Sequence, residues 1–275
     1  MSVINTNVSA LYAQNALKTN SRAQSAAMEQ LSTGSRINSA KDDAAGLAIG
    51  QNMTSQVRGL NQAVRNANDG INMLQTAEGA MVEVSNMLQR MRELAVQASN
   101  GTYSTTQRTY LNNEFSALSS QITSINTQTK WNGTAVLSAA TTTFQVGANS
   151  GQSVTVTVAA TTLSGLTINA STIAGASVAS GITNASTAIT KLDSAIGVIN
   201  QQRATLGAGI NRLTYAADNL TNISSNLSAS RSTIMVTDYA TASTLLSKTQ
   251  IIQQAATAML AQANQQPQSV LALLK

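Results

Sequence analysis

Few residues in this chain are of a type that could do chemistry. It contains no cysteine and no histidine. Thiol redox catalysis, Cys/His zinc sites, histidine ligation of haem and a Ser-His-Asp triad therefore lose the side chains that they require. The adjacent carboxylates of Asp42 and Asp43, beside Lys41, could form a metal or acid site. Acidic residues just before a helical pattern are more often cap and dipole partners, and we favour that interpretation.

The remaining patterns also fail to predict a catalytic centre. Gly207 and Gly209 are not part of a phosphate loop, because no strand precedes them and no Lys-Ser/Thr pair follows. Inside a helix they would permit close contact, at a cost of about 1 kcal/mol each. Aromatic residues make up 3% of the chain, so an aromatic-walled ligand pocket is not expected. We predict that the chain is not an enzyme and holds no cofactor or metal.

Charge is sparse. Charged residues make up 10% of the 275 residues, against roughly 25% in typical globular chains. The net charge is +5, but no two Lys or Arg residues are adjacent, so nucleic-acid binding is not expected. No run of about 18 apolar residues predicts membrane insertion. The first residues lack the basic and apolar regions of a cleaved secretory signal, so we expect either residence in the cytosol or export by another route.

Helices at heptad spacing must organise the fold. Three segments carry apolar residues alternately three and four positions apart, which is typical of helices that pack along a seam. The first segment predicts a helix over about residues 44–99, and the second predicts a helix that begins after Ser104. The third predicts a helix that extends to about residue 232, and Arg203 is the one polar residue in its seam. The first seam begins Met53, Val57, Leu60, Val64, Ala67, Ile71 and Leu74; the second is Leu111, Phe115, Leu118, Ile122 and Ile125; the third runs from Ile189 to Leu220.

The middle of the chain and its two ends follow other patterns. Residues 138–186 carry no charge, and β-branched runs predict a hairpin of residues 144–146 with 154–158 around a turn at 149–152. A third short strand could lie at residues 166–168. We expect this middle to tolerate deletion, for example within residues 160–180. Both ends have seven-residue repeats dominated by Ala, Gln and Thr, so we expect them to order only on assembly.

Several motifs at both ends resemble bacterial flagellins, over about residues 1–135 and 185–275. The matching segments are residues 4–7, 30–34, 36–38, 41–46, 90–97, 132–133 and 258–264. The resemblance implies a mainly α fold, with long antiparallel heptad helices that form a terminal coiled coil and a helical bundle, and a small β-hairpin region. Residues 1–42 and 236–275 would form the inner coiled coil, residues 43–130 and 188–235 the bundle, and residues 131–187 a short variable segment. Linkers near residues 33–46 and 230–240 would form a spoke.

The resemblance also implies the functional residues and partners. The expected function is that of the structural subunit of the flagellar filament: an extracellular homopolymer for motility, exported without a cleaved signal peptide. Expected partners are an export chaperone at the C-terminal helix, the flagellar cap, the hook-filament junction proteins and Toll-like receptor 5. The expected receptor contacts are Arg90, Leu94 and Glu114, on a surface that other subunits cover in the filament. The residues assigned to self-assembly are Leu11, Leu17, Leu31, Leu245, Ile252, Met259 and Leu273.

A second class of protein shares some of these features. A secreted coiled-coil interaction protein, either a type III translocator or an adhesin, would also have heptads and little cysteine. It should not share the motifs at both ends, and we therefore keep it only as the alternative.

Overall fold

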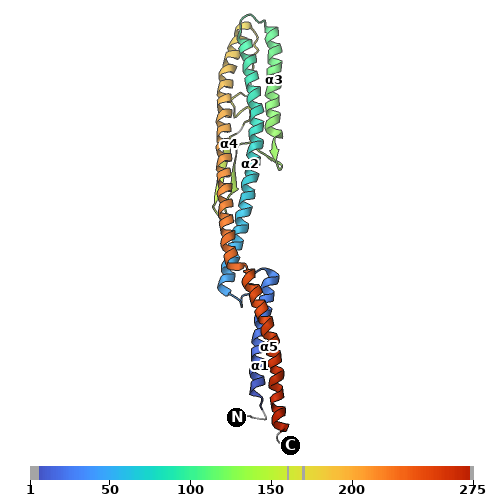
Figure 1. The fold of residues 1–275 in the computed structure, drawn as a ribbon. Helices are drawn as coiled ribbons and strands as arrows, with labels where there is room; N and C mark the ends of the chain where they lie inside the picture. Colours follow the sequence, from blue (N-terminus) through green and yellow to red (C-terminus); the bar gives the residue numbers. More distant parts are fainter. Residues whose placement is uncertain (1–5, 160, 169–170, 273–275) are drawn as a thin grey trace. The chain divides into compact units, whose positions relative to one another are not determined.

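The computed structural model describes residues 6–159, 161–168 and 171–272, and within them the chain is mainly helical (Figure 1). The predicted mainly α fold with a small β region is confirmed. No helix in the described part of the chain has the length and apolarity needed to cross a membrane. The helices are α1 (Val8–Thr33), α2 (Ala44–Ser99), α3 (Thr105–Gln128), α4 (Val178–Met235) and α5 (Tyr239–Ala272), and the strands are β1 (Lys130–Trp131), β2 (Thr134–Ala135), β3 (Ala140–Gln145) and β4 (Ser153–Val158).

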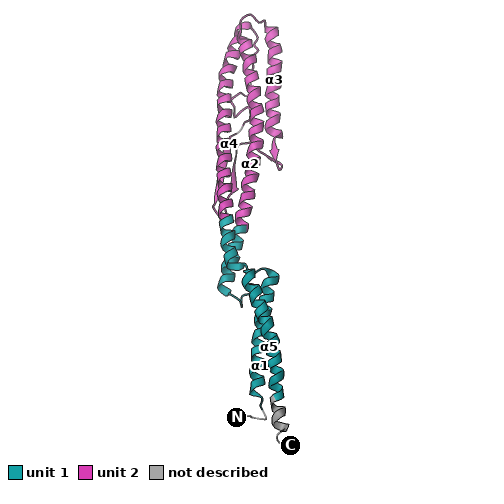
Figure 2. Ribbon diagram, viewed as in Figure 1, with its two compact units in different colours: residues 1–57, 225–275 teal, residues 58–224 magenta. Residues whose placement is uncertain are grey.

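The chain divides into two compact units (Figure 2). One comprises residues 1–57 and 225–275, and the other comprises residues 58–224. The division passes through α2 and α4 and does not coincide with the predicted limits at 42/43 and 235/236. The predicted limits lie near the ends of helices, and the predicted domain organisation stays a prediction.

The unit of residues 58–224 is a bundle in which α2 pairs with α3 and α4. The predicted helix over residues 44–99 is confirmed, because α2 begins at Ala44 and ends at Ser99. Ion pairs join Arg92 to Asp193 and Glu78 to Arg203, so residue numbers rise along α2 as they fall along α4, and the two helices are antiparallel. The fully buried apolar side chains of the bundle include Leu74, Met81, Leu88, Met91, Phe115, Ile122, Leu192, Ile199, Leu206 and Leu213.

Helix α3 returns along α2 after a short turn. Its first turn is fixed by a capping box: the Ser104 hydroxyl accepts from the Gln107 amide at 3.3 Å, and the Gln107 side chain accepts from the Ser104 amide at 2.9 Å. After α3, β1 and β2 form a minimal hairpin around Asn132 and Gly133, both with positive φ. A two-residue turn of this kind suits Asn-Gly, because Gly has no Cβ and Asn tolerates the left-handed region.

The predicted hairpin in the middle of the chain is confirmed. Strands β3 and β4 pair antiparallel from Ala140 opposite Val158 to Gln145 opposite Ser153. Strand β4 buries Val154, Val156 and Val158, whereas its alternate residues are exposed. The hairpin packs over Gly209, where a Cβ atom would approach Val156 to 2.9 Å. The close contact predicted at Gly209 therefore exists, but a strand also makes it, and nothing lies within 4 Å of a Cβ at Gly207.

The prediction of a third strand at residues 166–168 is wrong. These residues form a turn in which Thr167 has a φ of 59°, and their apolar side chains enter the bundle core. Leu166 is 1% exposed, Ile168 2% and Ile173 0%. Leu166 and Ile168 are buried two positions apart, as in a strand, but this turn places them in the core without a partner strand. Helix α4 also begins at Val178, inside the segment expected to be hairpin and loop up to residue 187.

Polar contacts attach this middle segment to α3. The Asn112 side-chain oxygen accepts from the Ile173 amide at 3.0 Å and from the Thr172 hydroxyl at 2.8 Å. The buried Thr161 hydroxyl donates to the Asn126 side-chain oxygen at 3.0 Å. Because these residues close part of the bundle core, the expectation that deletions within residues 160–180 are tolerated is withdrawn.

In the other unit, the two chain connectors lie side by side. Residues 34–43 join α1 to α2, and residues 236–238 join α4 to α5. Ser35 and Val236 form an isolated antiparallel bridge, the Arg36 amide donates to the Met235 carbonyl at 2.7 Å, and the Thr237 amide donates to the Gly34 carbonyl at 3.0 Å. The two predicted spoke linkers are therefore in contact.

The middle segment generates the first prediction. Replacing Ile173 with Ala should lower the free energy of unfolding by about 2–5 kcal/mol, because it leaves a cavity in a closed core. The matched control is Val178→Ala at a position that is 39% exposed, which should change it by much less. Urea unfolding followed by circular dichroism measures both variants. Equal, small effects would show that Ile173 does not contribute to the stability of the bundle.

Candidate assembly and recognition surfaces

Helices α1 and α5 pair through a seam of mainly small and polar side chains, with four leucines among them. Most of the residues of each helix that are buried or half-buried recur alternately four and three positions apart, which is the spacing of a coiled-coil seam. In α1 the seam consists of Ala13, Leu17, Asn20, Gln24, Ala27 and Leu31, with Ala10, Ala23 and Gln30 half-buried beside it, and in α5 it consists of Ala242, Leu246, Thr249, Gln253, Ala256, Leu260 and Ala263.

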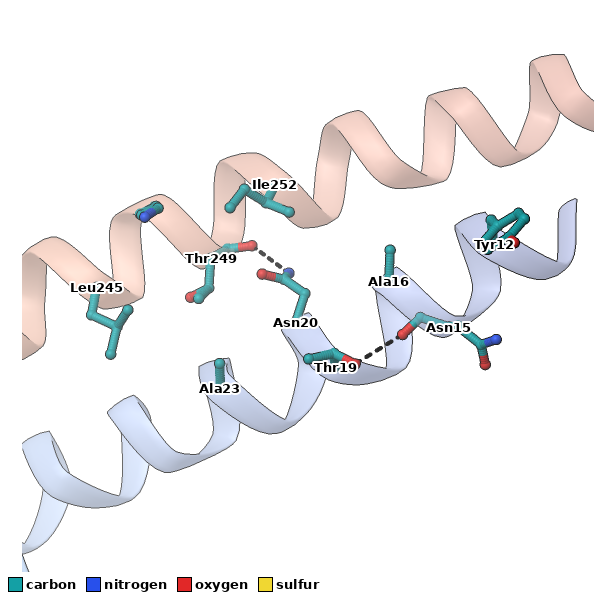
Figure 3. Close-up of a pocket in the computed structure, with 10 residues that line it drawn as sticks. Tyr12, Asn15, Ala16, Thr19, Asn20, Ala23, Leu245, Thr249 and Ile252 are labelled. Carbon is teal, nitrogen blue, oxygen red and sulfur yellow. Dashed lines mark hydrogen bonds between the residues drawn. The ribbon is translucent and has the colours of Figure 1, made fainter. Parts of the chain in front are cut away.

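Two asparagines fix how α1 and α5 are aligned. The buried Asn20 side chain donates to the Thr249 carbonyl at 2.7 Å, as Figure 3 shows. The Asn7 side chain donates to the Ala263 carbonyl at 2.8 Å. Together the two bonds show that the helices are antiparallel. A shift of the register would leave the buried Asn20 amide without its acceptor, so this residue specifies the alignment as a single buried Asn does in other coiled coils.

The structure separates the predicted self-assembly residues into two groups. Leu17 and Leu31 are half-buried in the α1–α5 seam. Leu11 is 55% exposed, Leu245 39%, Ile252 40% and Met259 67%. Leu273 lies outside the described residues. Their assignment to assembly between subunits stays a prediction, and only the four exposed ones present an apolar surface on the folded chain.

The α5 residues among them form a second row beside the seam. Leu245, Ile252 and Met259 each precede a seam residue by one position, which rotates them by about 100° around the helix. We call these three residues the apolar row of α5. Within the chain, the companion positions Ala242 and Thr249 are 4% and 3% exposed in the seam with α1, whereas the apolar row stays more exposed.

An open groove lies beside two members of the apolar row, Leu245 and Ile252. Its volume is about 640 Å³, and its lining is mostly apolar. Leu245 and Ile252 line it from α5, and Tyr12, Ala16 and Ala23 line it from α1 (Figure 3). Lys248 supplies a cationic group at its edge. The groove therefore offers a lengthwise apolar strip that suits the side chains of another helix.

The predicted receptor contacts lie on the pair of α2 and α3. Arg90 of α2 donates from Nε to Glu114 of α3 at 3.0 Å and from Nη1 to Glu93 at 2.9 Å. These bonds to carboxylates raise the pKa of the Arg90 guanidinium above its ordinary value. About half of each side chain in the Arg90–Glu114 pair is exposed. Arg90 and Glu114 therefore meet across the neighbouring helices α2 and α3.

Leu94 does not belong to the exposed part of that surface. Its side chain is 1% exposed and packs in the bundle core. Of the three expected receptor contacts, Leu94 is therefore not accessible at the surface of the folded chain. Residues four apart differ by only about 40° around a helix, so Arg90 lies at the edge of the buried face, where its long side chain reaches solvent, and Leu94 lies within that face.

Arg108 is a structural residue that the sequence patterns missed. Its side chain is fully buried, and it donates to the carbonyl oxygens of Ala98 at 2.8 Å, Asn100 at 2.7 Å and Tyr103 at 2.7 Å. These carbonyls belong to the end of α2 and the turn after it, where a cation complements the helix dipole. The available signal was its position three residues before Leu111, where a polar residue continues the spacing of the α3 seam.

Of the two adjacent carboxylates, Asp43 acts as a helix cap, as favoured from the sequence, whereas Asp42 stabilises the turn before α2. Asp43 accepts from the Gly46 amide at 2.8 Å and caps α2. Asp42 accepts from the Ser39 hydroxyl and amide, both at 2.9 Å, and the hydroxyl bond is the main cause of its lowered pKa. In the described ranges, no three Asp, Glu, His or Cys side chains gather into a group that could hold a metal ion.

Comparisons with known proteins agree with this architecture. The family described as "Bacterial flagellin N-terminal helical region" matches residues 4–142, and the "Bacterial flagellin C-terminal helical region" matches residues 189–274. A flagellin of Halalkalibacterium halodurans is 44% identical over 275 residues, which cover 99% of this chain and 100% of that protein. The "Flagellar filament 33 kDa core protein" of Treponema phagedenis is 40% identical over 287 residues, which cover 99% of this chain and 100% of that protein.

A solved structure shows the same relationship. The crystal structure of Bacillus cereus flagellin matches with a TM-score of 0.50 and 35% identity, and the match covers 61% of this chain and 94% of that one. Two family regions at the two ends, full-length relatives and this structure all lead to one conclusion: the chain belongs to the bacterial flagellin family.

Proposed function

We propose that the chain is the structural subunit of a bacterial flagellar filament, which it builds by polymerising with copies of itself outside the cell. Flagellins are structural filament proteins and not enzymes, and a relative at 40% identity is named as a filament core protein. The alternative of a secreted translocator or adhesin has no support, because family regions match both ends of the chain.

The exposed apolar row of α5 is the observation that carries this proposal. Leu245, Ile252 and Met259 are between 39% and 67% exposed, although they recur every seven residues on one helix. Such a row gains free energy when another helix covers it. A neighbouring subunit in a polymer supplies that helix, whereas α1 covers only the adjacent seam.

The weak seam between α1 and α5 suggests that polymerisation also completes the folding of the ends. Its most buried positions include Asn20, Ala27, Ala242 and Thr249, which provide little apolar area. Burial of little apolar area scarcely offsets the conformational entropy of two ordered helices. Copies of the chain that cover the apolar row would add the missing stabilisation.

Further partners follow from the same surfaces. An export chaperone would bind the apolar row of α5 before polymerisation and prevent premature contacts. The flagellar cap and the hook-filament junction proteins would contact subunits at the two ends of the polymer. Export without a cleaved signal peptide belongs to the same proposal.

Toll-like receptor 5 is proposed to recognise the monomer at Arg90 and Glu114. The exposed Arg90–Glu114 pair offers donors and acceptors on adjoining helices. Leu94 would act from the core beneath it, as a residue that holds this turn of α2 in place. Subunits packed over this surface in a filament would make the polymer less active than the monomer.

The first prediction of this function concerns the ends of the chain. In the monomer, backbone amides of residues 8–33 and 239–265 should exchange quickly with solvent, and polymerisation should protect them. Amides of residues 74–95, in the bundle core, should be protected in both states and serve as the internal reference. Hydrogen exchange with mass spectrometry measures all three segments. Strong protection of the two ends in the monomer would show that they fold without assembly.

The second prediction concerns the apolar row. The Ile252→Asp variant should form no filaments, because assembly would bury an unpaired carboxylate at a cost of about 3 kcal/mol or more. Its unfolding midpoint as a monomer should change little, since the side chain is 40% exposed there. Gln254→Asp places the same charge about 200° around the helix and is the control. Sedimentation and electron microscopy measure assembly. Normal filaments of Ile252→Asp would remove the row from the interface.

The third prediction concerns the receptor. Arg90→Ala should lower the potency of the monomer in a Toll-like receptor 5 reporter assay roughly thirtyfold, which corresponds to about 2 kcal/mol at an interface hot spot. Arg92→Ala is the control, because it also loses an exposed ion pair, to Asp193, but on another face of α2. Equal potency of both variants, or of monomer and filament, would reject this surface as the receptor contact.

A further inference from the structure

Methionines are the only sulfur-containing side chains of this chain. It has nine methionines and no cysteine, so reversible oxidation of sulfur can occur only at thioethers. Among the eight described methionines, exposure differs widely. Met81 and Met91 are 0% exposed in the bundle core, whereas Met28 is 53% and Met259 67% exposed. Oxidation follows access of the oxidant to sulfur, so Met28 and Met259 are the two preferred positions.

Only one of these two methionines lies on the apolar row. Met259 follows Ile252 by seven residues and continues the row to which Leu245 also belongs. Met28 lies on α1, one position after the buried Ala27, and is not part of the apolar row. Met28 can therefore serve as an internal control for Met259, because both residues are exposed and only Met259 lies on the surface assigned to assembly.

We infer that Met259 is a reversible oxidation site whose sulfoxide excludes the subunit from the polymer. This inference rests on the proposed function. The oxidant is a peroxide, for which hydrogen peroxide serves as the probe. A lone pair on the Met259 sulfur attacks one peroxide oxygen, the O–O bond breaks, and an S–O bond forms. Sulfur loses two electrons, and the second oxygen leaves as hydroxide, which takes the proton of the transferred OH group and becomes water.

The consequence for assembly follows from the polarity of the product. A thioether is flexible and apolar and adapts to an uneven helix surface. A sulfoxide is polar and would lose its water when another helix covers the row. In the monomer Met259 is exposed, so its sulfoxide stays hydrated and the fold is unaffected. Oxidation therefore acts on polymerisation and leaves the stability of the monomer nearly unchanged.

The experiment uses the full chain, treated with hydrogen peroxide until about half of the Met259 side chains carry one added oxygen. The sample is then polymerised and sedimented, and peptides from the pellet and the supernatant are compared by mass spectrometry. The Met259 sulfoxide should be depleted about tenfold or more in the pellet, whereas the Met28 sulfoxide should divide evenly. Treatment of the supernatant with methionine sulfoxide reductases should restore its ability to polymerise.

Two variants separate the sites. The polymer yield of each variant is compared with that of its own untreated sample. Peroxide should reduce the yield of Met28→Leu by the same factor as that of the wild type, and it should leave the yield of Met259→Leu unchanged. Even division of the Met259 sulfoxide between pellet and supernatant, or equal sensitivity of both variants, would overturn the inference. Failure of the untreated wild-type chain to polymerise would reject the proposed function itself, which distinguishes the two outcomes.

Discussion

The buried guanidinium of Arg108 holds together the end of the bundle where α2 turns into α3. A charge without a counter-ion inside a protein is costly unless its donors are satisfied. Here three carbonyl oxygens, on Ala98, Asn100 and Tyr103, accept from it at 2.7–2.8 Å. Gly181 of α4 packs directly against this side chain, since a Cβ there would lie 2.8 Å from the Arg108 Cδ atom. One residue thus positions three helices.

The alignment of α2 and α3 that Arg108 fixes determines the surface above it. Arg90 and Glu114 are 24 residues apart in the sequence, and they meet because the turn at residues 100–104 brings α3 back along α2. Any change in that turn would move the two side chains relative to each other along the helices. The recognition surface therefore depends on a residue that lies in the core and that no recognition partner could touch.

Much of the fold could be predicted from periodicity, and the departures have physical causes. The three long seams and the β3–β4 hairpin were predictable, because large apolar residues recur at the spacing of the structure that buries them. The turn at Leu166 and Ile168 was not, since alternate burial can be reached without a strand. Leu94 was misplaced because helical spacing alone does not show which face is buried. Arg108 was missed because its partners are backbone carbonyls, which leave no pattern in the side chains.

The terminal helices show how one sequence can carry two interfaces. Helix α5 has two seven-residue repeats, the second three positions after the first: small and polar residues such as Ala242 and Thr249, and the larger Leu245, Ile252 and Met259. Small side chains let two helices approach closely, so the first repeat forms the pair within the chain. It buries too little apolar area to be stable by a wide margin. The second repeat keeps the larger apolar groups outside that pair. A subunit built in this way reaches its full stability only among its copies, which joins the completion of folding to the growth of the polymer.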